Sequence, residues 1–386
     1  MEFVDLKTQQ KKIFEKIDGQ IKTVLHHGNF IMGPEVQELE KRLAAYIGVK
    51  YGIGCSSGTD ALLLSLMACS IGPGDAVFTT PFTFIATAEV ITLLGAVPIF
   101  VDIDPRTFNM DPQSLENAID RVINLKATPK NNFFDSSLTP RAIIAVDLFG
   151  LPADYQQLGL VAKKYGLTII EDGAQSFGGE LDGIKACALG QIGCTSFFPA
   201  KPLGCYGDGG MCFTENEPLA ESIRSLRIHG KGKDKYDNIR IGVNGRLDTL
   251  QAAILLAKFE IFDEEMEVRQ QIADRYTRLF KDIEIQRPQI PTGYKSAWAQ
   301  YSILFSSYSK RQECQKRLAS AGVPSAVYYP KPLHLQTAFN FLGYREGDFP
   351  VSESISKRIL SLPMHPYLSI ADQDKVVRLV SMENHF

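Results

Sequence analysis

A lysine in a glycine-rich turn and an acid at the end of an apolar run are the residues best suited to chemistry. Lys201 lies in the segment TSFFPAKPLGCYGDGG, after aromatic residues and before a run of glycines. A lysine on a tight turn between buried segments loses water, which favours its neutral, nucleophilic form. Asp172 ends the segment LTIIED. Because ligands of open α/β sheets bind at the carboxyl ends of strands, the carboxylate of Asp172 would point into such a site.

A segment rich in serine and glycine has the composition of a phosphate loop. It reads SSGTD over residues 56–60 and precedes an expected helix. Free N–H groups at a helix N-terminus favour an anion, and Gly58 would allow a close approach to the backbone. The hydroxyl of Ser196 could add a further donor. An ordinary helix cap is the alternative for this segment taken alone.

The segment PFTFIATAE, residues 81–89, places aromatic rings just beyond another expected strand. One ring could stack on a flat ligand, although a core position is the common role of such rings. A solvated lysine and a capping acid are likewise the ordinary roles of Lys201 and Asp172 taken singly. The order of phosphate loop, ring, acid and lysine is more specific. It supplies the groups that pyridoxal 5′-phosphate (PLP) requires from a protein.

The elements that must position these residues alternate between strand and helix. The expected strands cover residues 51–55, 76–80, 97–101, 142–146 and 168–171, and the expected helices cover residues 59–71, 85–94, 112–124 and 154–165. This alternation favours an α/β fold with a largely parallel sheet and helices on both faces. The polar, turn-rich segment 126–140 interrupts it, and we expect a surface excursion there.

Further elements are expected before and after this α/β unit. Apolar residues recur at helical spacing over 13–28 and 34–47, and a long helical stretch follows over about 247–282. The last part of the chain combines an expected strand over 300–305, a helix over 310–321 and proline-rich loops. We therefore expect a large domain over residues 1–250, and a bridging helix with a smaller α+β domain over residues 251–386.

The composition argues against several classes of protein. The chain has 386 residues and a formal net charge of −3, whereas nucleic-acid binders usually present a strongly basic face. Its seven cysteines contain no CxxC pair, so we expect reduced thiols and neither a disulfide framework nor a metal site. The charged N-terminus is unlike a secretory signal, and no apolar run is long enough to span a membrane. A cytoplasmic protein is expected.

Taken together, the motifs make the chain similar to the DegT/StrS family of sugar aminotransferases. The resemblance runs nearly end to end, from FVDLKTQQ to LSLPMHPYL. The motifs that carry it are GPEVQELE, SSGTDAL, PFTFIATAE, FVDIDPRTFNMDP, IIEDGAQSFGG, TSFFPAKPLGCYGDGG and GVNGRLDTLQAAIL. The resemblance implies the architecture of fold type I PLP-dependent aminotransferases, with PLP as the cofactor.

The resemblance also implies roles for individual residues. Lys201 matches the lysine to which the cofactor is attached, Asp172 the partner of the pyridine nitrogen, and Gln175 the residue that bonds the phenolic oxygen. The phosphate ligands and the stacking ring are matched by Gly58, Thr59, Ser196 and Phe84. Asn244 matches a residue that reaches the neighbouring subunit's cofactor, which implies a homodimer with shared active sites. Family members that dehydrate their substrates have histidine in place of the lysine, so Lys201 implies transamination.

Within the family, the chain resembles enzymes that aminate C3 of UDP-2-acetamido-2-deoxy-3-keto-glucuronic acid for bacterial surface polysaccharides such as O-antigen. The sugar-nucleotide contacts of that subgroup match Gly28, Phe30, Ala200, Arg246, Tyr328 and Tyr329. Three of these depart from the subgroup pattern, since Phe30 replaces a tyrosine, Ala200 a serine and Tyr328 a histidine. Arg246 remains, and its planar guanidinium suits a sugar carboxylate. An arginine paired locally for structural reasons is the alternative.

The implied reaction has two halves, with L-glutamate as the donor and a UDP-linked keto sugar as the acceptor. Lys201 would move the proton in each half. One alternative is an aminotransferase acting at C4 of a 4-keto-6-deoxy nucleotide sugar, which has no carboxylate for Arg246. The other is a PLP-binding regulatory protein without turnover, against which the complete set of Lys201, Asp172 and Gln175 argues.

Overall fold

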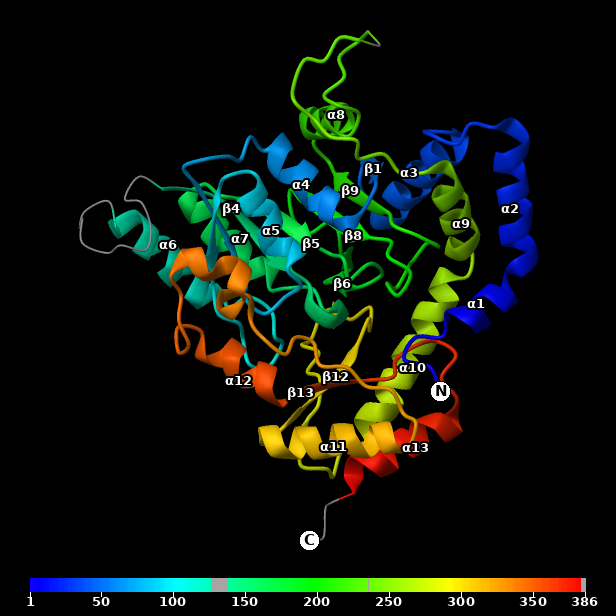
Figure 1. The fold of residues 1–386 in the computed structure, drawn as a ribbon, viewed down its shortest axis with the longest axis vertical. Helices are drawn as coiled ribbons and strands as arrows, with labels where there is room; N and C mark the ends of the chain where they lie inside the picture. The colour runs from blue at the N-terminus through cyan, green and yellow to red at the C-terminus, as the bar shows by residue number, and fades with distance from the viewer. Residues whose placement is uncertain (126–137, 235, 383–386) are drawn as a thin grey trace.

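The computed structural model describes residues 1–125, 138–234 and 236–382. Its centre is a seven-stranded sheet of order β1-β9-β8-β5-β4-β2-β3 (Figure 1). The strands are β1 (Tyr51–Cys55), β2 (Asp75–Thr79), β3 (Val97–Phe100), β4 (Thr139–Val146), β5 (Thr168–Asp172), β8 (Ile192–Ser196) and β9 (Gly210–Thr214). Neighbours from β3 to β8 are parallel, and β9 is antiparallel to both of its neighbours. The mostly parallel α/β sheet expected from the sequence is confirmed.

Both faces of this sheet are covered by helices. Ala142 and Ile144 of β4 pack in one core cluster, whereas Ile143 and Ala145 pack in a second one on the opposite face. The first cluster includes α4 (Gly58–Ala68), α5 (Ala86–Leu93) and α8 (Glu217–Leu226), and the second includes α6 (Pro112–Leu125) and α7 (Tyr155–Tyr165). Because successive side chains of a strand alternate between faces, a continuous apolar run is what a sheet buried on both faces requires.

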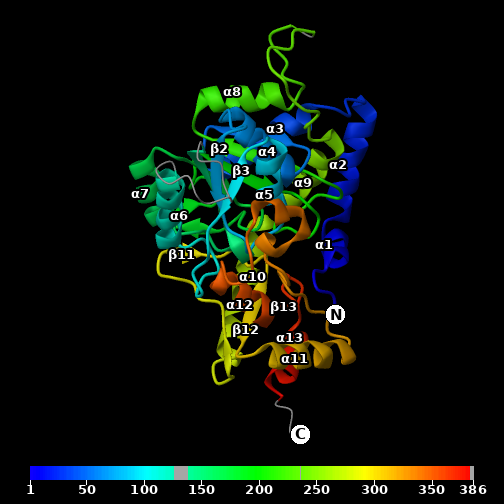
Figure 2. The same ribbon diagram turned by 60° about the vertical axis from the view of Figure 1, so that its left-hand side comes forward.

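The N-terminal helices pack beside the sheet with a helix from the middle of the chain (Figures 1 and 2). They are α1 (Leu6–Lys12), α2 (Phe14–His27), α3 (Pro34–Ile47) and α9 (Thr249–Phe259). The helix expected over 13–28 is confirmed as α2, which ends at Gly28. Gly28 has a φ of 70°, a left-handed conformation that glycine adopts without steric cost.

The helical stretch expected over 247–282 is two helices and not one. After α9 ends, α10 (Phe262–Leu279) starts with three acidic residues in its first turn. Acidic side chains stabilise a helix N-terminus, which suits a new start at this point. The break separates two packing environments, because α9 packs on α2 and α3 whereas α10 contributes Tyr276 to the core of the C-terminal unit.

The C-terminal unit is built on a three-stranded sheet of order β10-β12-β13, and a second small sheet, of order β11-β6-β7, joins it to the large one. Its elements are β10 (Ile285–Gln286), β11 (Tyr294–Lys295), β12 (Tyr301–Phe305), α11 (Tyr308–Ser320), η2 (Leu333–Leu335), η3 (Thr337–Leu342), α12 (Pro350–Arg358), β13 (Ile359–Leu362) and α13 (Ile370–Ser381). The remaining elements are β6 (Glu180–Leu181), β7 (Ile184–Lys185) and η1 (Leu148–Gly150). Figure 2 shows β12, α11 and α13 of this unit at the end of the molecule opposite to α8.

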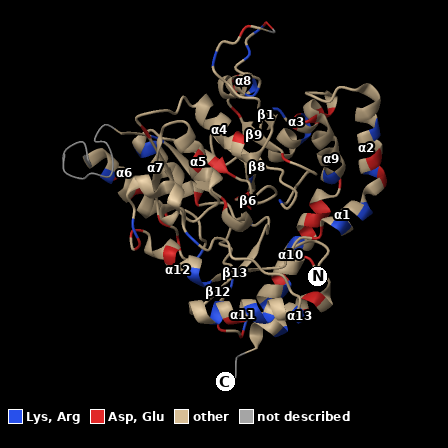
Figure 3. Cartoon of the chain, in the orientation of Figure 1, with Lys and Arg blue, Asp and Glu red and all other residues tan. Residues whose placement is uncertain are grey.

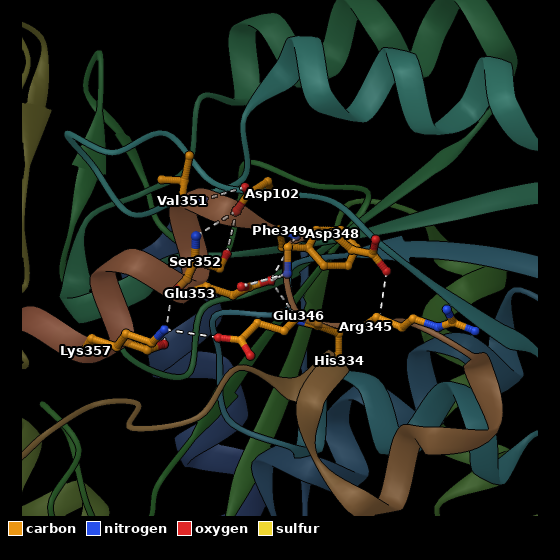
Figure 4. Close-up of polar contacts among 12 residues, drawn as sticks. Asp102, His334, Arg345, Glu346, Asp348, Phe349, Val351, Ser352, Glu353 and Lys357 are labelled. Atoms are coloured by element: carbon orange, nitrogen blue, oxygen red, sulfur yellow. Dashed lines mark hydrogen bonds and ion pairs between the residues drawn. The ribbon is translucent and has the colours of Figure 1, made fainter.

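The two units are joined by a polar network around the start of α12 (Figure 4). Asp102, which follows β3, accepts hydrogen bonds from the backbone N–H groups of Val351 and Ser352, each at 3.0 Å. Buried His334 and Glu353 lie beside them, with 3.0 Å between Nε2 and Oε1. These contacts fix the segment that follows Tyr329 against the large sheet.

The polar segment 126–140 is only partly described. Residues 126–137, where we expected a surface excursion, lie outside the described residues. Thr139 and Pro140 belong to β4, which therefore begins earlier than expected, because both pair with β2. Acidic and basic side chains are interspersed over outer helices such as α2 and α10 (Figure 3). Across the described residues, no helix has both the length and the apolar character needed to cross a membrane.

Candidate active site

Asp172 lies at the carboxyl end of β5, as the sequence predicts, and its side chain is buried. The hydroxyl of Thr87 donates a hydrogen bond to Oδ2 at 2.7 Å, and the backbone N–H of Ala174 donates to Oδ1 at 3.3 Å. Burial raises the pKa of Asp172, and both the Thr87 bond and the positive charge of Lys201 oppose that shift. The carboxylate is therefore oriented and can receive a cation or an N–H group.

Lys201 lies in the turn after β8, where its backbone N–H donates to the carbonyl of Phe198 at 2.9 Å. Burial lowers the pKa of Lys201, and the negative charge of Asp172 raises it. The two groups are thus near enough to influence each other's protonation, although they come from different strand ends. A desolvated lysine with a lowered pKa has the properties of a nucleophile and of a proton carrier.

The expected phosphate loop forms the N-terminus of α4. The hydroxyl of Ser57 accepts from the backbone N–H of Asp60 at 3.0 Å, and the hydroxyl of Ser56 bonds to the Asp60 carboxylate. A Cβ on Gly58 would lie only 2.6 Å from the Cβ of Ser196, so glycine is required there. Gly58 and Ser196 are thereby brought together, with Thr59 next in the helix, and the helix N-terminus suits an anion.

The amide of Gln175 is held between the two structural units. Its Oε1 accepts from the backbone N–H of Phe149 at 2.7 Å, and its Nε2 donates to the hydroxyl of Tyr329 at 3.2 Å. The ring of Tyr329 also packs edge-on against Phe82, with centroids 6.2 Å apart. The structure therefore places Tyr329, a predicted sugar contact, directly on Gln175, a predicted cofactor contact.

Phe84 is the predicted stacking ring, and it lies just before α5. Its side chain is 57% exposed, so the ring is open to a ligand and is not part of the core. Thr87, the donor to Asp172, follows three residues later in α5. The same short segment thus carries the candidate ring and the residue that orients the acid.

Arg246 and Asn244 line a hollow next to the phosphate loop. The lining residues are Ile31, Ser56, Gly207, Asp208, Asn244, Arg246, Asp248 and Gln251. Arg246 pairs through its backbone with Cys55 at the end of β1. Its Nε is buried without a hydrogen-bond partner, and among the described residues its guanidinium forms no ion pair. The interpretation of Arg246 as a locally paired structural residue is therefore not supported.

The other predicted sugar contacts fall into three places. Phe30, which is 48% exposed, accepts through its carbonyl from the backbone N–H of Thr249, so the segment after Gly28 lies against the segment of Arg246. Tyr328 lies beside Tyr329 and the ring of Phe3. Ala200 is exposed next to Lys201.

Two residues that position the site were not singled out from the sequence. Thr87 orients Asp172, and the backbone of Phe149 fixes the orientation of the Gln175 amide. Thr87 lies inside the motif PFTFIATAE, yet a threonine near a helix start has no distinctive signal. Phe149 acts through its backbone N–H, which carries no sequence information. Within the described part of the chain, no group of His, Cys, Asp or Glu residues could hold a metal ion.

The chain is similar to known proteins over almost its whole length. The model of the DegT/DnrJ/EryC1/StrS aminotransferase family matches residues 11–381. The chain is 49% identical to UDP-2-acetamido-2-deoxy-3-oxo-D-glucuronate aminotransferase of Pseudomonas aeruginosa, over 96% of this chain and 97% of that one. It is 42% identical to a pleiotropic regulatory protein of Geobacillus stearothermophilus, over 99% and 98%. The solved structure of a DegT/DnrJ/EryC1/StrS aminotransferase from Brucella abortus has a TM-score of 0.92 and 50% identity, and covers 98% of both chains.

The residues present suit the cofactor of that family. A helix N-terminus with Gly58 and Ser196 side by side fits a phosphate, a buried carboxylate fits a ring nitrogen, and a desolvated lysine fits covalent attachment. Enzymes of this family use PLP. Because the family match and the full-length relatives cover almost the whole chain, we conclude that this protein belongs to the DegT/DnrJ/EryC1/StrS aminotransferase family and is a PLP-dependent sugar aminotransferase.

Proposed function

We propose that this enzyme transfers the amino group of L-glutamate to the C3 keto group of a UDP-linked 2-acetamido-2-deoxy-hexuluronic acid. The product would be UDP-2-acetamido-3-amino-2,3-dideoxy-glucuronic acid, a precursor for surface polysaccharides such as O-antigen. The observation that carries this choice is Arg246, whose buried Nε has no partner in the hollow beside the phosphate loop. A sugar carboxylate would pair with this guanidinium. The activity of the Pseudomonas aeruginosa relative agrees with the same substrate.

We assign to the site residues the roles that the family resemblance implies, and their contacts support these roles. PLP, when bound, supplies a ring that accepts electrons from the carbon that loses its proton. Lys201 Nζ accepts the α-proton of glutamate in the first half of the reaction, and in the second half a proton is returned to C3 of the sugar. Asp172, oriented by Thr87, would pair with the ring nitrogen of the cofactor, and Gln175 would donate to its phenolic oxygen.

The remaining cofactor contacts hold the phosphate and cover the ring. Backbone N–H groups at Gly58 and Thr59, with the hydroxyl of Ser196, would hold the phosphate, and Phe84 would stack on the ring. Lys201 loses its charge more readily than an exposed lysine, because burial lowers its pKa. This favours proton transfer near neutral pH.

We further propose that the enzyme works as a homodimer in which Asn244 reaches the cofactor phosphate of the neighbouring subunit. Asn244 is exposed, and it is preceded by Ile241, whose side chain is 89% exposed. Ile239 is also exposed, and two large apolar side chains in one exposed segment favour coverage by another chain. An isologous two-fold interface would present both copies of Asn244 symmetrically. The cytoplasm is the compartment we propose, since the seven cysteines are unpaired thiols.

The second candidate is amination at C4 of a 4-keto-6-deoxy nucleotide sugar. The observation in its favour is the loss of hydroxyl groups at Phe30 and Ala200, which removes sugar contacts expected for the C3 subgroup. Two acids, Asp208 and Asp248, also line the hollow of Arg246. Their negative charges would repel the carboxylate of a uronic acid. The alternative of a regulatory protein without turnover is set aside, because the chain is an aminotransferase by family.

The experiment that separates the two candidates is product analysis. The enzyme is incubated with L-glutamate and either a UDP-linked 3-keto uronic acid or a 4-keto-6-deoxy nucleotide sugar, and the products are identified by mass spectrometry. We expect the amino sugar from the 3-keto acid. Formation of an amino sugar only from the 4-keto substrate would overturn the proposed function in favour of C4 amination.

A further inference from the structure

A second buried acid lies directly behind the cofactor-facing segment, and none of the roles above includes it. Asp147 follows β4, next to the end of β5, and is fully buried. Its backbone N–H donates to the carbonyl of Asp172 at 3.1 Å, and its Oδ2 accepts from the hydroxyl of Ser176 at 2.7 Å. Asp147 thus contacts both ends of the segment 172–176, which contains Gln175.

The other oxygen of the same carboxyl group is bonded to a different part of the fold. Oδ1 accepts from the backbone N–H of Ala153 at 2.9 Å and from the hydroxyl of Tyr155 at 2.8 Å, at the start of α7. Asp147 therefore links α7 to the segment 172–176. Removal of this carboxyl group would leave the hydroxyls of Tyr155 and Ser176 buried without their acceptor, which is costly in a dry interior.

The acid that precedes Asp172 holds the same segment from its other side. Glu171 is fully buried and accepts from the backbone N–H groups of Leu189 at 2.8 Å and Gly190 at 3.1 Å. Burial and the nearby charge of Asp147 raise the pKa of Glu171, and burial raises the pKa of Asp147 to about 6. Asp172 is thus bonded through its carbonyl to Asp147, and it follows a glutamate whose carboxylate is itself fixed by backbone donors.

We propose that Asp147 is a positioning residue that holds Asp172 and Gln175 as one rigid unit facing the cofactor. It touches neither cofactor nor substrate and acts through the Ser176 hydroxyl and the Asp172 backbone. Groups that contact a ligand must be held within a fraction of an ångström of the productive position. The residues that pack against them and bond to them determine whether this precision is reached. The inference rests on the proposed cofactor contacts of Asp172 and Gln175.

The test is retention of PLP by the holoenzyme. Cofactor loss on dilution is followed by absorbance for wild type, Asp147→Ala, Asp147→Asn and Ser176→Ala. We expect Asp147→Ala to weaken retention by about tenfold or more, since buried donors lose their acceptor. Asp147→Asn keeps one oxygen for Ala153 and Tyr155, and its amide can donate to the Ser176 oxygen. It should stay within about threefold of wild type.

A matched control separates positioning from general stability. Glu265 is also a buried acid, but its hydrogen bonds go to Gln9 and Tyr367, away from the candidate site. Glu265→Ala should lower the unfolding temperature and leave cofactor retention near wild type. If Asp147→Ala does not fold, PLP retention by Ser176→Ala tests the proposal by itself, because the Ser176 hydroxyl donates a hydrogen bond to Asp147.

Unchanged retention in both Asp147→Ala and Ser176→Ala overturns the proposal, and so does equal loss in Glu265→Ala. Gln175→Ala, measured in parallel, tests the cofactor contact itself. If Gln175→Ala weakens retention and the Asp147 and Ser176 variants do not, the proposed contact stands and the positioning role of Asp147 is wrong.

Discussion

The side-chain amide of Gln175 donates to the hydroxyl of Tyr329 at 3.2 Å and thereby joins the large sheet to the C-terminal unit at the candidate site. Burial and nearby acidic charge raise the pKa of Tyr329 well above that of free tyrosine, so its hydroxyl stays protonated and can donate in turn. One residue predicted to contact the cofactor and one predicted to contact the sugar are thus coupled by a single hydrogen bond. A substitution at either residue should therefore alter the function of the other.

Tyr329→Phe tests this coupling. The change removes the hydroxyl that accepts from Gln175 and leaves the ring against Phe82. We expect kcat/KM for the keto sugar to fall by about tenfold, because a buried donor loses its partner. Steady-state kinetics measure this effect. Tyr276→Phe is the matched control, because its buried hydroxyl donates to the carbonyl of Pro363 inside the core of the C-terminal unit. An equal loss in both variants would contradict the coupling.

Lys201 is predicted to carry the cofactor. Borohydride reduction of the holoenzyme, followed by peptide mapping, should label Lys201. Lys201→Ala should lose the label together with transamination. Lys258 offers an internal comparison, because it is buried and burial lowers its pKa to about 8. A label on Lys258 or on another lysine would show that the central assignment is wrong.

Arg246→Ala tests substrate choice. Loss of a charge-assisted pair leaves the sugar carboxylate unpaired, at a cost of about 2–5 kcal/mol, or well over tenfold in catalytic efficiency. Wild type should prefer the 3-keto uronic acid over an uncharged 4-keto-6-deoxy sugar, and the variant should shrink that preference. Competition between the two sugars measures it directly. No preference in the wild type would show that the departures at Phe30, Ala200 and Tyr328 were the better guide.

Subunit mixing tests the shared site. Lys201→Ala and Asn244→Ala subunits should each be inactive or strongly impaired, because each lacks a cofactor contact. A heterodimer would contain one site with neither change if Asn244 serves its neighbour, so partial activity should return. Activity is measured after subunit exchange has been verified by native mass spectrometry. If subunit exchange is verified and no activity is recovered, each active site is formed by residues of a single chain.

His334 predicts a pH effect on stability. Burial lowers its pKa, and this shift is opposed by hydrogen bonding and charge attraction to Glu353. The unfolded chain therefore binds a proton more readily than the folded protein, and the free energy of unfolding should fall as the pH drops below about 6.5. His334→Gln keeps a donor toward Glu353 and removes the titration. Its unfolding temperature should fall less than that of wild type between pH 7.5 and 5.5, and an identical fall would contradict this.

The sequence by itself predicted five of the seven strands of the sheet and the residues that we expect to face the cofactor. The apolar runs of β1, β2, β3 and β5 and the helices between them follow from local periodicity and from glycine and proline at their ends. Asp172 and Lys201 were found because strand ends and glycine-rich turns are local signals. The family motifs extended this to Gln175 and Asn244.

Only the tertiary structure decided how these residues are supported. Asp147 meets Ser176 across two neighbouring strands, Thr87 reaches Asp172 from another helix, and Tyr329 reaches Gln175 from the C-terminal unit. Such contacts join residues that are far apart in the chain, so no periodicity or spacing encodes them. The break between α9 and α10 likewise follows from two packing environments, which a continuous helical pattern cannot reveal.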